Sequence, residues 1–117
     1  MRKFTLLLSL SILLISACTN APKIIQLKFQ PMQCEQTPWE KWYAEGNIQY
    51  FIEPTEKQLV TDYYEFKYNI AIMDFEKIEP GLAVCQACSV CPQDYFFNVK
   101  VKNVDADTLI AEGWAEI

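Results

Sequence analysis

The stretch Val84-Cys85-Gln86-Ala87-Cys88-Ser89-Val90-Cys91-Pro92 places three cysteines within seven positions. It lies between two segments whose apolar and polar residues alternate as they do in β-strands. Two further cysteines, Cys34 and Cys18, stand apart from this cluster, and the chain has no histidine. Because the chemistry of a cysteine depends on whether its compartment is oxidising, the destination of the chain has to be inferred first.

The N-terminal residues have the features of an export signal. Arg2 and Lys3 precede an apolar run, residues 4–15, which is shorter than the roughly 20 residues that a membrane span needs. The run leads into Ile15-Ser16-Ala17-Cys18, which resembles the lipobox of bacterial lipoproteins. The resemblance implies cleavage before Cys18 and acylation, with palmitate among the acyl chains, of its thiol and new amino group. A plain secretory signal with an incidental cysteine is the alternative.

The resemblance also divides the chain into a signal peptide (residues 1–17), a lipidated tether (18–23) and a single domain (24–117). Two or more acyl chains make a stable anchor where one does not. The five residues after Cys18 reach less than about 20 Å, so we expect the domain to lie close to the membrane. Thr19 is not the aspartate that retains enterobacterial lipoproteins in the inner membrane. We therefore expect a cell-envelope protein outside the cytosol, with the outer membrane favoured.

The net charge and the lack of histidine exclude several classes of function. Loss of Arg2 and Lys3 with the signal lowers Lys+Arg from 10 to 8 against 15 acidic residues, a net charge of 8 − 15 = −7. This balance argues against nucleic-acid partners, which need a basic face. Without histidine, Ser-His and Cys-His nucleophiles are excluded. Carboxylate pairs such as Asp105 and Asp107 are better explained as helix-capping groups. We expect no enzyme activity and no catalytic residue.

The four cysteines after the tether are expected to form two disulfides: Cys34, Cys85, Cys88 and Cys91. Three pairings exist, and each joins Cys34 to the cluster across more than 50 residues, a cross-link worth about 4 kcal/mol in the chain-entropy treatment. We favour Cys34–Cys88 with Cys85–Cys91, since a C-x-x-C ring tends to be strained and reducible. The spacing leaves the other two pairings open.

Two alternatives use the same cysteines. The four thiolates of Cys34, Cys85, Cys88 and Cys91 could bind zinc or copper. The run also resembles part of the bacterial ferredoxin motif, but here Pro92 follows the third cysteine and no fourth lies downstream. In the second alternative, Cys88 and Cys91 perform thiol–disulfide exchange, although no helix is predicted to begin at Cys88. On the disulfide interpretation no cofactor is expected.

Alternation of apolar and polar residues predicts the strands. The clearest are residues 23–30 and 95–102. The same pattern predicts a strand that begins at residue 66, bends or bulges near residues 73–75 and is broken by Glu79-Pro80-Gly81. Residues 47–52 alternate over a shorter length and predict a short strand or an extended connector.

Capping signals predict the helices. Thr37 with Glu40, and Thr55 with Gln58, each form a capping box, and Asp105 is expected to cap a third helix over residues 106–112. The order of elements predicts the α+β class. We expect a small two-layer sandwich, with about three short helices on a three- to four-stranded, mainly antiparallel sheet.

The first predicted helix offers a candidate partner surface. Trp39, Trp42 and Tyr43 lie at i, i+3 and i+4 and therefore share one face, close to Cys34 and the cysteine cluster. Aromatic residues in so small a domain more often belong to the core. The predicted protein is a membrane-anchored envelope lipoprotein with a disulfide-stabilised binding or structural module. Its expected partners are membrane lipid, through Cys18, and an envelope protein or peptide.

Overall fold

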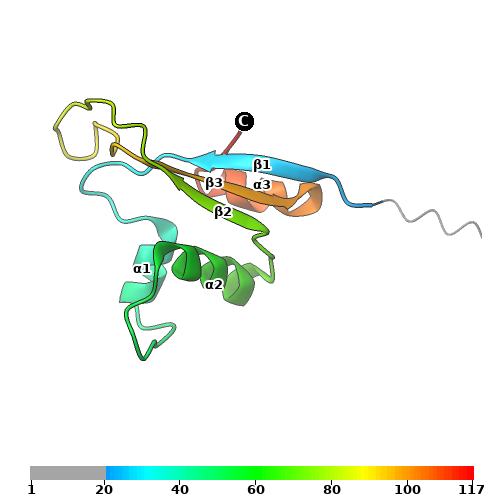
Figure 1. Cartoon of the computed structure of the whole chain (residues 1–117). Coiled ribbons are helices and arrows are strands. Elements are labelled where there is room, and N and C mark those ends of the chain that lie inside the picture. Colours follow the sequence, from blue (N-terminus) through cyan, green and yellow to red (C-terminus); the bar gives the residue numbers. More distant parts are fainter. Residues whose placement is uncertain (1–20) are drawn as a thin grey trace, which may run out of the picture.

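The computed structural model describes residues 21–117, which form a four-stranded antiparallel sheet with three helices (Figure 1). Cys18, the predicted signal and the first part of the tether lie outside the described residues. The sheet order is β2-β3-β1-β4, and the α+β class is confirmed. Along the chain the elements are β1 (Ile24–Phe29), α1 (Pro38–Ala44), α2 (Glu56–Tyr68), β2 (Asp74–Ile78), β3 (Phe96–Lys102), α3 (Asn103–Ala111) and β4 (Ala115–Glu116).

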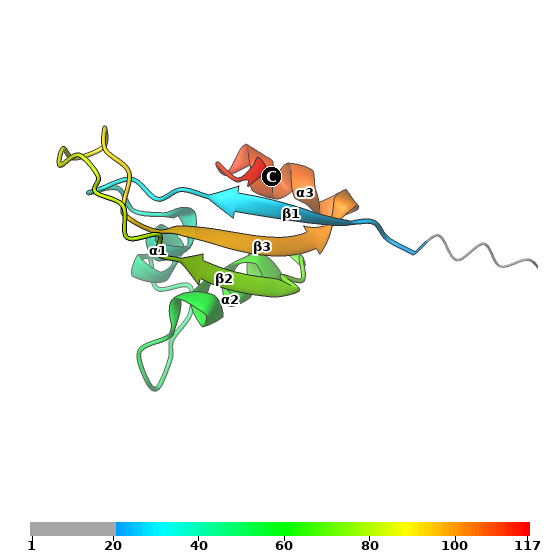
Figure 2. The same cartoon turned by 45° about the horizontal axis from the view of Figure 1, so that its top comes forward.

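One face of the sheet carries the hydrophobic core and the other stays open. Leu27 of β1 lies opposite Val99 of β3, which in turn lies opposite Phe75 of β2. These residues belong to or pack against the core, and the helices lie on one face of the sheet (Figure 2). The alternate positions belong to the other face and are mostly polar, although they include Ile24, Ile78 and Phe96. The buried core residues are Leu27, Trp39, Leu59, Val60, Tyr63, Tyr64, Ile70, Phe97, Val99, Val101, Ala106, Leu109 and Trp114.

The starts of the first two helices follow the predicted capping. The Thr37 hydroxyl accepts a hydrogen bond from the Glu40 N–H at 3.3 Å, and the Thr55 hydroxyl accepts one from the Gln58 N–H at 3.1 Å. Each threonine thereby satisfies one of the N–H groups that a helix leaves unpaired in its first turn. Pro38 takes the first helical position of α1, where no N–H is needed.

The strand predicted from residue 66 is wrong over its first part, whereas its last part, after the expected bend and before Glu79, is β2. Residues 66–68 complete α2, and Asn69 ends the helix in the left-handed conformation, with φ of 54°. Its N–H donates to the Glu65 carbonyl, and asparagine tolerates this conformation better than most residues. The chain then enters the sheet only at Asp74. Residues 47–52 form no strand either; they belong to the connection between α1 and α2.

The third helix begins earlier than its predicted cap. α3 starts at Asn103, and Lys102 occupies the N-cap position without a side-chain hydrogen bond. Asp105 therefore lies in the first turn of α3 and does not cap it. The Asn103 N–H instead donates to the Lys23 carbonyl at 2.8 Å, which joins the start of the helix to the start of β1. The two-residue strand β4, which pairs with β1, was not predicted.

An aromatic cluster centred on Trp39 joins the helices to the sheet. The Trp39 ring is fully buried, with its centroid 4.8 Å from that of Phe29 and 5.8 Å from that of Trp114. Trp114 Nε1 donates to the Tyr64 hydroxyl at 2.8 Å, and that hydroxyl lies 3.2 Å from Glu112 Oε2. The chain end after α3 is therefore fixed to α2 by polar contacts inside an otherwise apolar core.

Replacing Trp39 with alanine should destabilise the fold far more than the same change at Tyr43. Trp39→Ala removes a fully buried indole and should cost about 3–5 kcal/mol of unfolding free energy, whereas Tyr43→Ala, on the exposed side of α1, should cost less than about 1 kcal/mol. Urea unfolding followed by circular dichroism measures both. Equal losses would contradict the assignment of Trp39 to the core.

Stability should fall as the pH rises above about 10, the ordinary pKa of tyrosine. Burial, followed by the nearby Glu112 carboxylate, raises the pKa of both Tyr63 and Tyr64 above that value. Both phenols therefore ionise more readily in the unfolded chain, so unfolding releases protons in this range and alkali favours it. Urea midpoints measured from pH 8 to 11 should decline, and Tyr64→Phe should make the decline shallower. An unchanged slope in Tyr64→Phe would contradict this cause.

Candidate functional site

The four cysteines of the described chain form two disulfides at one end of the sheet. Cys34 pairs with Cys88, with Cα atoms 5.0 Å apart, and Cys85 pairs with Cys91, with Cα atoms 5.5 Å apart. This is the pairing that the spacing favoured. Both bonds lie in or reach the connection between β2 and β3, and we call residues 84–92 the cystine loop (Figure 1).

Backbone hydrogen bonds hold the cystine loop against the segment that follows β1. The Gln33 N–H donates to the Cys91 carbonyl at 3.0 Å, and the Ser89 N–H donates to the Gln33 carbonyl at 2.7 Å. The Gln93 N–H donates to the Pro31 carbonyl at 2.9 Å. The Cys34–Cys88 bond therefore closes a contact that is also built from the backbone, so the loop has a defined position although most of it is exposed to solvent.

The side chain of Gln33 joins the two ends of the cystine loop. Its Nε2 donates to the Cys85 carbonyl at 2.7 Å and to the Pro92 carbonyl at 3.0 Å. Gln30 acts in a similar way just before it, with Nε2 within 3.1 Å of the Gln93 carbonyl. Sequence reasoning missed both residues, because glutamine has no spacing signal and their acceptors lie more than 50 residues away.

The surface beside the cystine loop is partly apolar. Val90 and Leu82 are 75% and 70% exposed, whereas Cys91 is buried. A hollow of about 190 Å³ lies where the loop meets the sheet, lined by Leu82, Val84 and Tyr95 among others. Burial raises the pKa of the Tyr95 phenol, although the ammonium of Lys77 opposes the shift. Tyr95 is therefore a neutral hydrogen-bonding group at physiological pH.

The aromatic residues of α1 do not form the predicted surface with the cystine loop. Trp39 is fully buried, so its assignment to a partner surface is wrong. Trp42 packs edge-on against Tyr63 at 5.6 Å between ring centroids, and Tyr43 packs against Tyr50 at 5.7 Å. The hollow that Trp42 lines is made of α1 and α2 residues. In the fold the three side chains have different surroundings: Trp39 is in the core and Trp42 packs against α2, whereas Tyr43 is 36% exposed and packs against the α1–α2 connection.

The disulfides determine what chemistry the cysteines can perform. Metal binding needs thiolates, and the sulfur atoms of two disulfides are not thiolates. Residues 21–117 contain no group of three or more acidic, histidine or unpaired cysteine side chains arranged to hold a metal ion. Residues 88–90 form a turn and not the first turn of a helix, where a reactive thiolate is usually stabilised.

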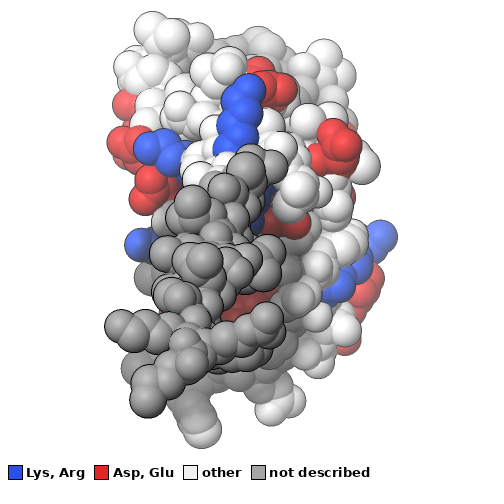
Figure 3. All heavy atoms as spheres, turned by 90° about the vertical axis from the view of Figure 1, so that its right-hand side faces the viewer, with Lys and Arg blue, Asp and Glu red and all other residues white. Residues whose placement is uncertain are grey.

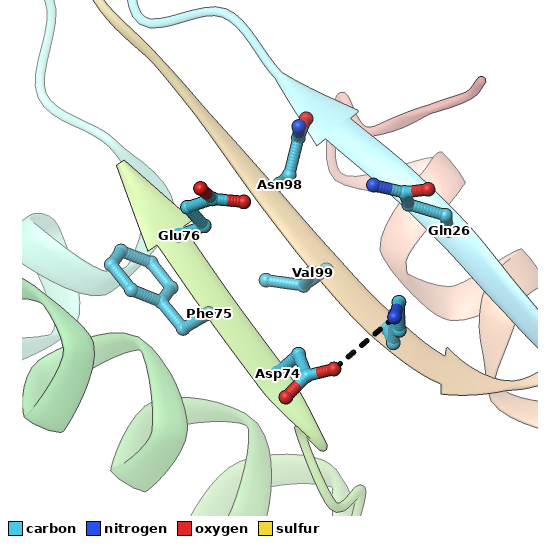
Figure 4. Close-up of a pocket in the computed structure, with 7 residues that line it drawn as sticks. Gln26, Asp74, Phe75, Glu76, Asn98 and Val99 are labelled. Atoms are coloured by element: carbon cyan, nitrogen blue, oxygen red, sulfur yellow. Dashed lines mark ion pairs between the residues drawn. The ribbon is translucent and has the colours of Figure 1, made fainter. Parts of the chain in front are cut away.

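A second, polar hollow lies on the open face of the sheet (Figure 4). It measures about 330 Å³, and an ion pair between Asp74 Oδ2 and Lys100 Nζ at 3.4 Å borders it, with Glu76 and Asn98 beside them. Asn98 Oδ1 is buried without a hydrogen-bond partner among the described residues. A donor from outside the domain would satisfy this oxygen. Its polar lining consists of the Asp74 and Glu76 carboxylates, the Lys100 ammonium and the amides of Gln26 and Asn98.

No family model, curated protein or solved structure matches the chain. Over residues 21–117, no helix is both long enough and apolar enough to span a bilayer.

Removing the two disulfides separately should have unequal effects. Cys34→Ser with Cys88→Ser opens a loop of sequence separation 54 and should cost about 4 kcal/mol, whereas Cys85→Ser with Cys91→Ser opens a loop of separation 6 and should cost about 2 kcal/mol. Urea unfolding of the two double variants gives both values. A larger loss in the Cys85/Cys91 variant would contradict the view that the long cross-link stabilises the domain more.

Proposed function

We propose that this chain is a lipoprotein of the bacterial cell envelope, anchored through acylated Cys18, with a disulfide-stabilised binding or structural module. The observation that carries the proposal is the pairing of Cys34 with Cys88 and of Cys85 with Cys91. The described residues then hold no thiol left over to pair with Cys18, which suits a separate role for that cysteine. Disulfides of this kind persist outside the cytosol, in agreement with the signal-like N-terminus.

The cystine loop is the proposed contact surface of the module. It lies at the end of the sheet opposite the start of β1, and it is held by disulfides and by Gln33 (Figures 1 and 2). A surface fixed in advance loses little conformational entropy on binding, which favours recognition of a partner. Val90 and Leu82 supply exposed apolar contacts there. An envelope protein or peptide is the proposed partner.

No enzymatic reaction is proposed for this chain. Cys34, Cys85, Cys88 and Cys91 serve the fold as disulfides, and the acidic residues serve solubility. Thr19 after the acylated cysteine favours the outer membrane over the inner one, by resemblance to the sorting rule of enterobacterial lipoproteins.

Substituting Cys18 tests the anchor. The full chain expressed in a bacterium fed alkyne-tagged palmitate should become labelled, and Cys18→Ala should abolish the label because the acyl acceptor is gone. Cys34→Ser with Cys88→Ser is the matched control, since it also removes thiols and should keep the label. Gel fluorescence after click chemistry reads all three proteins. Label retained in Cys18→Ala, or lost in the control, would contradict acylation at Cys18.

A further inference from the structure

The end of the domain from which the tether leaves, here called the Ile24 end, combines residues from three parts of the chain. Ile24 of β1 lies opposite Lys102, and the Lys23 carbonyl accepts from the Asn103 N–H at 2.8 Å. The Met73 N–H donates to the Lys100 carbonyl at 2.9 Å, which brings the chain before β2 to the same end. These contacts place the start of β1, the start of β2 and the start of α3 side by side.

Three apolar side chains are exposed at the Ile24 end. Val104, in the first turn of α3, is 76% exposed, and Ile24 and Met73 are each 44% exposed. Ile24 and Met73 also line one broad hollow of about 540 Å³. A small, acidic, exported domain has no folding reason to expose three large apolar side chains at one end, so a surface of contact is the simpler explanation.

Three lysines lie at the same end, together with the acidic side chains of Asp74 and Asp105. Lys23, Lys100 and Lys102 are three of the eight lysines left after the signal, in a chain whose net charge is then 8 − 15 = −7. Lys100 is paired with Asp74, whereas no ion pair within the described residues involves Lys23 or Lys102. Figure 3 looks onto this end and shows lysine side chains on both sides of it, beside acidic ones. Lysines flanking apolar residues suit a membrane interface, where the stems lie along the apolar region and the ammonium groups meet phosphates.

The length of the tether determines how far this end can be from the bilayer. Ile24 lies six residue steps after Cys18, and a fully extended chain of that length spans at most about 22 Å. A lipid-anchored Cys18 therefore keeps the Ile24 end within that distance of the headgroups. The cystine loop lies beyond the far end of β1 (Figure 2). If the Ile24 end touches the bilayer, the loop points away from it.

We propose that the Ile24 end is a bilayer-contacting surface, in which Ile24, Met73 and Val104 enter the headgroup region while Lys23 and Lys102 contact anionic lipid phosphates. This inference rests on the proposed anchoring through Cys18. It assigns an orientation: the cystine loop faces away from the membrane that holds the chain, and its partner must approach from that side.

Photo-cross-linking from lipid headgroups tests the orientation. The full acylated chain is reconstituted in vesicles of phosphatidylethanolamine and phosphatidylglycerol that contain a phospholipid with a diazirine in its headgroup. Mass spectrometry after illumination should find lipid adducts on segments that carry Ile24, Met73 and Val104. Adducts concentrated instead on Val90 of the cystine loop, or on Phe51 of the exposed α1–α2 connection, would overturn the proposal.

Two double variants that reverse charge distinguish direct contact between the Ile24 end and lipid from mere closeness to the bilayer. Lys23→Glu with Lys102→Glu should lower the adduct yield at Met73 several-fold, because the phosphates then repel this end. Lys41→Glu with Lys57→Glu makes the same change of charge on α1 and α2, and it should leave the yield unchanged. Equal yields in the two variants would overturn the proposed lysine contacts.

The same samples show which proposal has failed. A chain that lacks the acyl mass and does not co-sediment with the vesicles would contradict both the proposed anchor and the proposed orientation. A chain that is acylated and co-sediments, but carries its lipid adducts away from the Ile24 end, would contradict the proposed orientation alone.

Discussion

The disulfide between Cys34 and Cys88 is the constraint on which the arrangement of this domain depends most. It joins the connection after β1 to the connection between β2 and β3. These two irregular segments are therefore held against each other by a covalent bond. A domain as small as residues 21–117 buries a limited core, and a cross-link over 54 residues is a large addition to a stability of only a few kcal/mol. Gln33 and the Ser89 N–H then complete the polar contacts that the cross-link brings into reach.

The confirmed predictions concern features that depend on residues close together in the sequence. Alternation predicted β1 and β3, and the hydroxyls of Thr37 and Thr55 predicted where α1 and α2 begin. The strand predicted from residue 66 failed over its first residues, because alternation among four apolar residues competes there with a helix that has already formed. Its last part is β2. The helix, α2, buries Tyr63 and Tyr64 in the core, and it ends where Asn69 adopts a positive φ.

The site was less accessible to sequence reasoning, because its contacts span long separations. The spacing of Cys85, Cys88 and Cys91 indicated two disulfides but left the pairing open, and nothing marked Gln33, whose acceptors lie 52 and 59 residues away. The aromatic face of α1 was identified correctly as a face, yet its spacing cannot tell whether it meets the core or a partner. The predicted surface combined the cystine loop with these aromatics; in the fold Trp39 fills the centre of the core, and the loop remains the candidate.

The central claim is that one cross-link, Cys34–Cys88, fixes the loop whose outer surface is available to a partner. Its most direct test is disulfide mapping of unreduced protein from an oxidising compartment. Because trypsin leaves Cys85, Cys88 and Cys91 together on the peptide spanning residues 78–100, electron-transfer fragmentation has to locate the bonds. We predict Cys34 linked to Cys88 beside a Cys85–Cys91 ring. Cys34 linked to Cys85 or Cys91, or four thiols open to alkylation, would contradict the account.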